Sequence, residues 1–427
     1  MDTARLTRGI AGRRALGQTI FDELRRNTSQ GEGICRPSYS KEEDFAHRLL
    51  GKSAAELGFE VSRDAAANTY MTFPGRDRQA PKIVIGSHLD SVEAGGNYDG
   101  AAGVVAGLVA IAGLKDSGFT PSRDIAVMGI RAEESAWFNV SYIGSRSALG
   151  VLPASVYDTA KRIDTDRVLS EHMTESGGNP KALQQGRPPL PRDSLHAYLE
   201  VHIEQGPRLV AERLPVGIVE GIPGNFRHPE IVVSGGYGHV GSARQDRRDA
   251  VIAASAFVTT LDRLWEETLG ARQSMGMTVG RFFTDAAHHA LTKVSGRVEL
   301  SLDVRSTDPV VLKGLQTRVH AMAREIAEAK RVTIDMGRIT HAEVGVMDKT
   351  IVEALGRGAK ALSIPHMHLP SPASHDAAAF AAAGVPTAMI FVRNDHGSHN
   401  PREHMEMDDF MQATSLLGWW LATTGAA

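Results

Sequence analysis

Histidine and carboxylate residues recur at the ends of apolar segments in this chain. The segment KIVIGSHLD places His88 and Asp90 directly after a short β-branched run. A second carboxylate, Asp99, follows through the glycine-containing stretch SVEAGGNYDG. Imidazoles and carboxylates without cysteine are the donors that hydrolytic zinc, manganese or cobalt sites use. The pattern predicts a metal site and raises the question of why glycines separate the two aspartates.

Three further segments carry the same residue types at the ends of predicted strands. RDIAVMGIRAEES ends in the adjacent pair Glu133 and Glu134, where solvated charge is unexpected. In LEVHIEQG the alternation places His202 on the face opposite the apolar residues. The loop RNDHGSHNPREH contributes His396 and His399. Because ligands bind at the carboxyl ends of strands in open α/β sheets, we expect these side chains to converge there.

The segments that would position these residues follow a mixed α/β order. YSKEEDFAHRLLGKSAAELG predicts an amphipathic helix with a capping box of Ser40 and Glu43 and a stop at Gly58. Strands FEVSRDAAANTYMTF and KIVIGSH, the small-residue helix AAGVVAGLVAIAGL and the strand RDIAVMGI follow. The strand PTAMIFV and a closing helix resume this layer near the C-terminus. We predict an α/β fold class with a mixed sheet.

A self-contained unit interrupts that layer. From 222 to 338 the order is strand, long helix, two strands, helix and strand, which is ferredoxin-like in outline. We therefore predict a catalytic domain formed by residues 1–221 and 339–427, with an inserted βαββαβ domain at 222–338.

Composition limits the classes of protein that fit. The chain has 427 residues, 42% hydrophobic and 23% charged, which suits a soluble protein of two domains. Its net charge of -3 gives no electrostatic case for nucleic acid or an anionic membrane. No signal peptide or membrane span is predicted, and the single cysteine, Cys35, excludes an internal disulfide, so we expect a cytoplasmic location.

Five strings in order resemble a known family. GSHLDSVEAGGNYDGAAGV, AEESAWF followed by GSR, HIEQGP, RRDA and GSHNP are similar to the M20-type metal-dependent amidohydrolases of the hydantoinase/carbamoylase group. That group includes N-carbamoyl-L-amino acid hydrolases, allantoate amidohydrolases and ureidoglycolate hydrolases. The resemblance runs from about Ile34 to Glu403 and implies that the inserted domain is a lid that also forms a homodimer interface.

The resemblance implies two divalent metal ions per subunit, zinc or alternatively manganese, cobalt or nickel. The implied ligands are His88, Asp99, Glu134, His202 and His399. His88 would share one ion with Glu134 and His399, His202 would bind the other, and Asp99 would bridge both.

Further roles follow from the same resemblance. Asp90 would orient the ring of the first histidine ligand, and Glu133 would be the general base that activates a bridging water. Gly95 and Gly96 would let the chain double back towards the bridging carboxylate, after which a cis peptide before Gly100 is expected.

The resemblance also implies contacts to a small-molecule substrate. The residues concerned are Gln205, His239, Thr292, Arg305 and His375. His239 would reach the partner's active site and act in catalysis, and Arg305 would hold a substrate carboxylate through two parallel hydrogen bonds.

Departures from the family pattern occur at substrate-facing positions. They are Arg244, Gln245, Thr292, Ser295 and Pro372. Because of these departures the sequence does not fix the exact substrate. The native metal is not fixed either, since histidine and carboxylate ligands accept several divalent ions.

The predicted reaction is hydrolysis of a linear C–N amide bond in a small carboxylate-bearing N-carbamoyl or ureido compound. An aminoacylase or peptidase reaction on an N-acyl amino acid or dipeptide is the alternative, and His202 weighs against it because many peptidase relatives have a carboxylate there. A degenerate scaffold would be expected to lose Glu133 or a ligand, yet all six are present. A serine hydrolase is disfavoured because no Gly-x-Ser-x-Gly elbow occurs.

Overall fold

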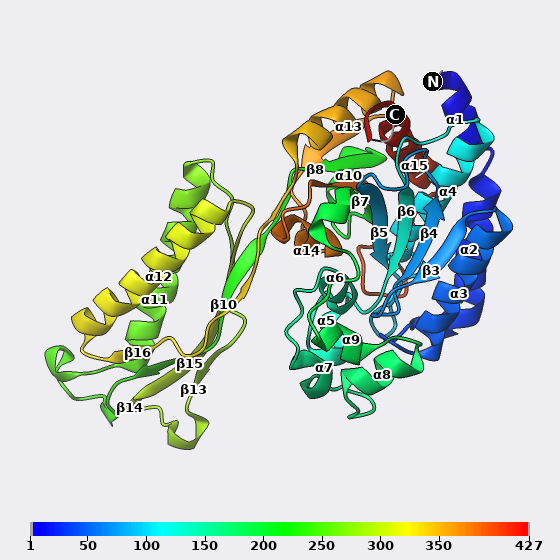
Figure 1. The fold of residues 1–427 in the computed structure, drawn as a ribbon. Helices are drawn as coiled ribbons and strands as arrows, with labels where there is room; N and C mark the ends of the chain where they lie inside the picture. Colours follow the sequence, from blue (N-terminus) through cyan, green and yellow to red (C-terminus); the bar gives the residue numbers. More distant parts are fainter. Residues whose placement is uncertain (1–2, 426–427) are drawn as a thin grey trace. The chain divides into compact units, whose positions relative to one another are not determined.

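The computed structural model describes residues 3–425, which divide into two compact units. Unit 1 comprises Met1–Ile222 and Val346–Ala427, and unit 2 is Pro223–Gly345. Figure 1 shows the elements of each unit with their labels.

An eight-stranded mixed sheet forms the centre of unit 1. Its strands, in spatial order, are β19 (His366–Leu369), β8 (Val216–Val219), β20 (Thr387–Val392), β7 (Leu195–Ile203), β5 (Lys82–His88), β6 (Ile125–Ile130), β4 (Thr69–Phe73) and β3 (Glu60–Arg63). β20, β7, β5 and β6 run parallel, whereas β8 and β4 are antiparallel to their neighbours in this set. The carboxyl ends of the four parallel strands therefore lie at one edge of the sheet. The predicted mixed α/β fold is confirmed.

Successive residues of β5 face two separate cores. Ile83 and Ile85 belong to one core with the helices of one layer, and Val84 belongs to a second core. The first layer consists of α1 (Thr3–Ala11), α2 (Arg14–Thr28), α3 (Lys41–Glu56), α4 (Ala101–Asp116), α13 (Lys349–Ala361) and α15 (Met407–Trp420), and the second contains α6 (Ile143–Ala148) and α14 (Asp376–Ala382). α4 owes its small residues to close packing, because a Cβ at Gly103 would lie 2.1 Å from the carbonyl oxygen of Val201.

The predicted signals around α3 are present. Ser40 caps the helix by accepting the N–H of Glu43 at 3.3 Å, and the chain leaves it through Gly58 with a φ of +75°. The remaining short elements of unit 1 are β1 (Ser29–Gln30), β2 (Gly33–Ile34), α5 (Ser135–Phe138), α7 (Val156–Thr159), α8 (Leu169–Glu175), α9 (Pro180–Gln184), η1 (Arg192–Ser194), α10 (Arg208–Glu212), β9 (Gly221–Ile222) and η4 (Leu421–Gly425), with β18 (Gly345–Val346) at the border between the units.

Unit 2 is an antiparallel sheet with two long helices on one face. Its elements are β10 (Gly224–Ser234), β11 (Gly238–His239), η2 (Arg244–Asp246), α11 (Ala250–Gly270), β12 (Gly276–Thr278), β13 (Phe282–Thr284), η3 (Ala286–His288), β14 (Lys293–Val294), β15 (Arg297–Ser306), α12 (Pro309–Lys330), β16 (Thr333–Asp335) and β17 (Thr340–Ala342). β15 and β10 are central, with β12 and β13 on the outer side of β15, and β16 and β17 on the outer side of β10.

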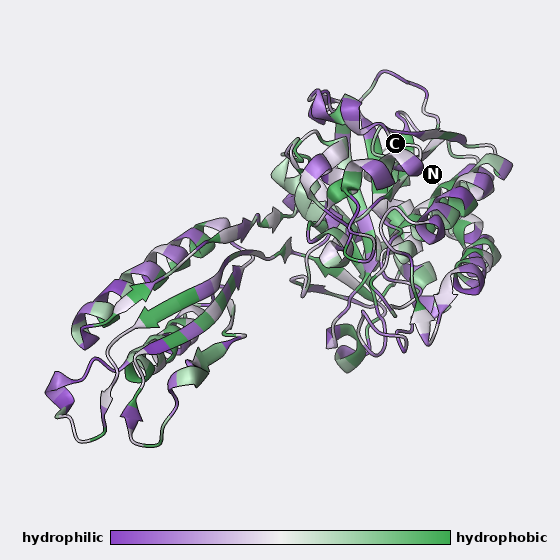
Figure 2. Cartoon of the chain, turned by 90° about the horizontal axis from the view of Figure 1, so that it is seen from below, coloured by the Kyte–Doolittle hydropathy of each residue, from purple (hydrophilic) through white to green (hydrophobic). Residues whose placement is uncertain are grey.

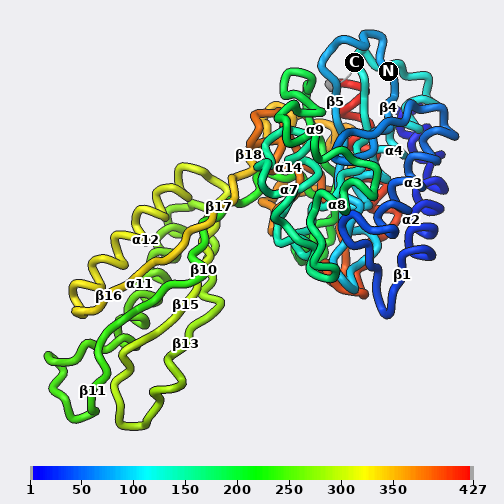
Figure 3. Tube along the Cα trace, turned by 60° about the horizontal axis from the view of Figure 1, so that its bottom comes forward, coloured from blue at the N-terminus to red at the C-terminus, as the bar shows by residue number. Residues whose placement is uncertain are grey.

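Figure 3 shows α11 and α12 side by side along these strands. Apolar residues of both helices and of the central strands form a separate core. In Figure 2 the helices of this unit alternate hydrophilic and hydrophobic colours along their length, as helices covering one face of a sheet should. The C-terminal border of the unit lies at Gly345 rather than near 338, because β17 still pairs with β10.

A buried ion pair fixes the segment that follows β6. The guanidinium of Arg131 donates to Glu43 of α3 at 2.8 Å, and both side chains are fully buried. The same carboxylate accepts the N–H of Ala132 at 3.1 Å. Ala132 itself has a φ of +51°, an unusual conformation for alanine. The pair therefore holds a strained turn directly before Glu133 and Glu134.

We predict that Arg131→Leu destabilises the protein by about 3–5 kcal/mol, because it leaves the Glu43 carboxylate buried without its cation. Urea denaturation followed by circular dichroism measures the change. Arg167→Leu is the matched control, since Arg167 makes its ion pairs at the surface. Equal midpoints for the two variants would contradict the structural role of the pair.

Candidate metal centre

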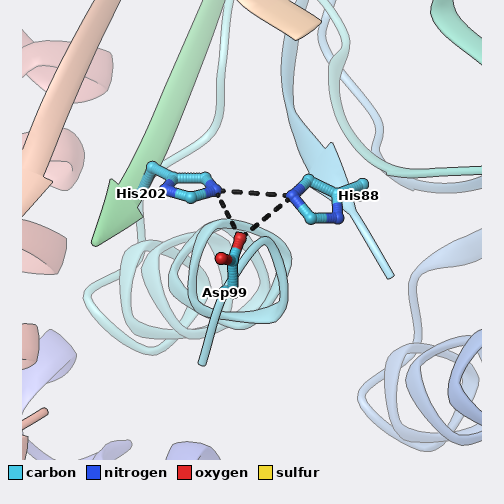
Figure 4. A group of neighbouring side chains, drawn as sticks. All are labelled: His88, Asp99 and His202. Carbon is cyan, nitrogen blue, oxygen red and sulfur yellow. Dashed lines mark hydrogen bonds and ion pairs between the residues drawn. The ribbon is translucent and has the colours of Figure 1, made fainter. Parts of the chain in front are cut away.

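The predicted ligands meet at the carboxyl edge of the four parallel strands. His88 is the last residue of β5, His202 lies near the end of β7, and Glu134 and His399 follow β6 and β20. Figure 4 shows the rings of His88 and His202 and the carboxylate of Asp99 pointing toward one another. The Oδ1 atom of Asp99 lies 3.3 Å from Nε2 of His88 and 3.2 Å from Nε2 of His202.

The hydrogen bonds of the two rings fix which nitrogen faces the centre. Nδ1 of His88 lies 3.0 Å from the carbonyl oxygen of Asp90, and Nδ1 of His202 lies 2.9 Å from that of Ile203. A carbonyl oxygen can only accept, so each Nδ1 carries a proton and donates it. In the neutral rings both Nε2 atoms then present lone pairs, and they are 3.4 Å apart.

The donor set fits a divalent cation. Oδ1 of Asp99 is buried and accepts no hydrogen bond from any residue in the 3–425 range. Three electron-pair donors therefore converge on one point, which is unfavourable unless protons or a cation lie between them. His88, Asp99 and His202 offer ligand atoms within 4.8 Å of one another, as a metal site requires.

A second group shares the same aspartate. Nε2 of His399 lies 3.3 Å from Oε1 of Glu134 and 3.5 Å from Oδ2 of Asp99. These three residues also qualify as a metal-binding group. The geometry thus brings His88 and His202 together at Asp99, whereas His88 also lies in a metal-capable group with Glu133 and Glu134. His88 and His202 meet because β5 and β7 are neighbours in the sheet.

Asp90 connects the ends of two strands. Its Oδ1 accepts the N–H of Glu133 at 3.0 Å and its Oδ2 that of Glu134 at 3.2 Å. Oδ1 also lies 3.4 Å from Nδ1 of His88, although the main-chain carbonyl of Asp90 is closer. The carboxylate of Asp90 therefore positions Glu133 and Glu134, while its main-chain carbonyl holds the ring of His88.

The expected cis peptide after Asp99 is absent: every peptide bond across the described residues is trans. Gly100 instead adopts a φ of +67°, and a Cβ there would lie 2.5 Å from the ring of His88. Glycine relieves the crowding at this point through its positive φ and its missing side chain.

Burial and hydrogen bonding shift the titration of these groups. Burial raises the pKa of Glu133 well above its usual value, and the neighbouring carboxylates of Glu134 and Asp376 add to the effect. Its carboxylate accepts no hydrogen bond within the part of the chain described, which leaves it available to take up a proton. The hydrogen bond to Glu134 raises the pKa of His399 to about 9.

Two predicted substrate contacts lie in unit 1. Nε2 of Gln205 donates to Oδ2 of Asp99 at 2.8 Å, so this side chain contacts the predicted bridging carboxylate directly. His375 is buried against the ring of His202, with ring centroids 4.4 Å apart, and burial lowers its pKa. A cavity of about 300 Å³ adjoins Gln205 and is lined by Gln205, Gly206, Pro207, Val210, Asn394, His396 and Gly397. Pro372, one of the departures, packs beside Gly206.

The other predicted contacts lie in unit 2, where each has local partners. His239 is exposed, and its Nδ1 accepts the N–H of Gly241, which leaves the proton of the neutral ring on Nε2. Arg305 donates to Asp303 at 2.8 Å through Nε. Thr292 is exposed and uses its carbonyl to accept the N–H of Val240.

Three departures from the family pattern are also in unit 2. Ser295 accepts the N–H of Ala250 through its carbonyl and so tethers the start of α11. Arg244 and Gln245 line a basic cavity of about 650 Å³ with Arg247, Asp249, Ile252, Ala329, Lys330 and Arg331. Within the wall of this cavity, Arg331 donates a hydrogen bond to the carbonyl oxygen of Gln245.

Sequence reasoning missed several buried carboxylates of the centre. Glu200 accepts hydrogen bonds from Ser87 and from the N–H of Ala377, both at 2.8 Å. Asp376 accepts one from Ser145 at 2.5 Å. The alternation in LEVHIEQG already placed Glu200 on the face of His202, so this residue could have been found.

Comparisons with known proteins identify the family. Residues 84–421 match Peptidase family M20/M25/M40, and because this is most of the chain, the chain belongs to that family. It is 32% identical over 389 residues to an N-carbamoyl-L-amino acid amidohydrolase of Geobacillus stearothermophilus, covering 90% of this chain and 92% of that protein. It is 29% identical over 397 residues to an allantoate amidohydrolase of Escherichia coli, covering 91% and 92%.

A solved structure also has a similar fold. A hydantoinase/carbamoylase family amidase from Burkholderia multivorans matches with a TM-score of 0.82 at 28% identity, covering 95% of this chain and 97% of that one. The predicted family is confirmed, and the chain is a hydrolase of the amidohydrolase type. M20 enzymes are generally metal-dependent, which agrees with the residue groups found. None of the described helices has the length and apolar composition of a membrane span.

We predict that His88→Ala and His399→Ala each reduce bound divalent metal, because each removes an imidazole from a three-residue group. Elemental analysis after dialysis against a zinc-containing buffer measures the content. His396→Ala should retain metal at the wild-type level, since His396 is exposed and belongs to neither group. Loss of metal in His396→Ala alone would reassign the ligand in this loop.

Proposed function

We propose that the chain hydrolyses a linear C–N amide bond in a small carboxylate-bearing N-carbamoyl or ureido compound, using two divalent metal ions. The observation that carries the proposal is the convergence of the Nε2 atoms of His88 and His202 on Oδ1 of Asp99, beside Glu133, whose carboxylate accepts no hydrogen bond from the described residues. His88 and His202 would hold one ion and Glu134 and His399 the other, with Asp99 between them.

Different residues of the chain would take part in different steps of the reaction. Bound divalent ions supply Lewis acidity, which polarises a carbonyl and makes water more acidic. Glu133 takes the proton of the attacking water, a task for which its raised pKa suits it, and returns that proton to the leaving nitrogen. Gln205, beside Asp99 and the adjoining cavity, is placed to hold a polar group of the substrate.

The proposed substrate class is supported by residues of this chain and by the reactions of the similar proteins. The relatives named above are amidohydrolases of N-carbamoyl-L-amino acids and of allantoate, and both substrates contain a carbamoyl group on nitrogen. Arg305 uses Nε and one NH2 group on Asp303, which leaves further N–H donors for a substrate carboxylate. An aminoacylase or peptidase reaction is the alternative, and the imidazole of His202 at its ligand position favours the carbamoyl reaction.

A substrate panel tests the proposal. The zinc-, manganese- and cobalt-loaded proteins are incubated with N-carbamoyl, ureido, N-formyl and N-acyl amino acids and with dipeptides, and ammonia and amine release are measured separately. Carbamoyl and ureido acids should be turned over fastest. Preference for N-acyl amino acids or dipeptides would establish the alternative reaction.

We predict that Glu133→Gln lowers kcat by at least ~10²-fold, because the amide cannot take the proton from water. Metal content should stay at the wild-type level, since Glu133 is assigned no ligand role. Kinetics on the best panel substrate, with elemental analysis of the same sample, measure both quantities. Loss of metal in this variant would exchange the roles of Glu133 and Glu134.

We further propose that unit 2 is a ferredoxin-like lid through which the protein forms a homodimer, with His239 acting at the partner's active site. Two observations support this. The neutral ring of His239 carries its proton on Nε2 in an exposed position, where it could donate to a developing oxyanion. The outer strand β13 exposes Phe282 and Phe283, whose accessible fractions are 40% and 60%.

Subunit mixing tests this arrangement. We predict that Glu133→Gln and His239→Ala, each inactive alone, regain a sizeable fraction of wild-type activity when their subunits exchange, because one site of the heterodimer then carries neither defect. Activity is assayed after exchange has been confirmed by native mass spectrometry. Exchange without recovery would mean that His239 serves its own chain's site or none.

A further inference from the structure

The carboxylate of Glu403 accepts hydrogen bonds from the backbone at the predicted bridging ligand, Asp99. Its Oε1 accepts the N–H of Tyr98 at 2.8 Å and that of Asp99 at 3.2 Å. The side chain is 4% exposed. It comes from the loop after β20, four residues beyond His399, so one loop supplies both a predicted ligand and this carboxylate. Two consecutive main-chain N–H groups held by one oxygen fix the direction in which the Asp99 side chain leaves the backbone.

Gly96 is what allows Glu403 to come so close. A Cβ at position 96 would lie 2.1 Å from the Cδ atom of Glu403 and 2.2 and 2.4 Å from its two oxygens. The backbone of Gly96 has no positive φ, so conformational freedom is not the reason for glycine here. At the neighbouring Gly95 a Cβ would find nothing nearer than 3.2 Å. The two adjacent glycines therefore have different roles.

We propose that Glu403 and Gly96 form a positioning device for Asp99: the missing side chain at Gly96 admits the Glu403 carboxylate, which holds the Asp99 backbone so that its carboxylate can bridge the two metal groups. This inference rests on the metal centre of the proposed function. Glu403 forms no hydrogen bond to a predicted ligand atom among the described residues and acts through the main-chain N–H groups of Tyr98 and Asp99. Outer residues that orient a metal ligand typically contribute a factor of 10–100 in metal affinity.

Paired variants test the proposal in the full-length protein. Gly96→Ala, which displaces the carboxylate, and Glu403→Ala, which removes it, should each weaken Zn²⁺ binding about 10–100-fold. Gly95→Ala is the matched control and should bind zinc within about 3-fold of the wild type, because its contacts are not prohibitively short. Glu403→Gln should also stay near the wild type, since its amide oxygen can accept both N–H groups.

Zinc affinity is measured by competition with a chromophoric chelator, and the melting temperature of each zinc-free variant is recorded beside it. A merely structural role for Glu403 would lower the melting temperature of Glu403→Ala while leaving its zinc affinity near the wild-type value, and that result would overturn the proposal. Equal zinc affinity of Gly96→Ala and Gly95→Ala would also overturn it. If Glu403→Ala does not fold, the two glycine variants decide the question.

The same measurements separate this proposal from the metal centre itself. Weakened zinc binding in His88→Ala with wild-type binding in Glu403→Ala and Gly96→Ala would leave the centre standing and refute only the positioning device. Absence of zinc binding by the wild-type protein would refute both.

Discussion

Electrostatic repulsion among buried carboxylates is the constraint on which the rest of unit 1 depends. The region around the predicted ligands contains seven buried acidic side chains: Asp90, Asp99, Glu133, Glu134, Glu200, Asp376 and Glu403. In a medium of low dielectric constant such a cluster cannot stay ionised without donors or cations. Burial raises the pKa values of Glu133, Glu200 and Asp376, and neighbouring carboxylates add to the effect at Glu133 and Asp376.

Main-chain N–H groups near the strand ends donate hydrogen bonds to several of these carboxylates and so stabilise their charge. Asp90 accepts the N–H groups of Glu133 and Glu134, Glu200 accepts that of Ala377, and Glu403 accepts those of Tyr98 and Asp99. Each of these carboxylates thus has at least one oxygen that accepts from the main chain. Oδ1 of Asp99 has no such donor among the described residues, and it is the atom that both Nε2 nitrogens face. The candidate cation position is thus the point where an acceptor without a donor, Oδ1 of Asp99, also meets two imidazole nitrogens.

Close approach of backbone segments is the second requirement of this arrangement. Gly100 lies against the ring of His88, Gly96 against Glu403, and Gly103 against the end of β7. Any side chain at these points would separate the strand ends from α4 and from the loop after β20. The glycines of this region therefore permit contact, and only Gly100 among the three also needs a left-handed conformation.

The sequence by itself determined the residue types of the centre and the order of the elements. Short apolar runs that end in His88, Glu133 and His202 could be placed at strand ends, since periodicity and turn residues are local properties. The inserted segment was visible for the same reason, although its C-terminal border was set by the pairing of β17 with β10, a contact between distant residues. The five predicted ligand positions came from the resemblance of the sequence's motifs to the family.

Only the tertiary structure decided which of these residues contact one another. The pairing of His88 with His202 depends on β5 and β7 being neighbours in the sheet, which no local pattern states. Gln205 and Glu403 both contact Asp99, although each lies far from it in the chain. The conformation of Gly100 depends on the crowding around it. Hydrogen-bond satisfaction and steric exclusion act between segments that packing brings together, and for that reason the spacing of residues along the chain could not supply them.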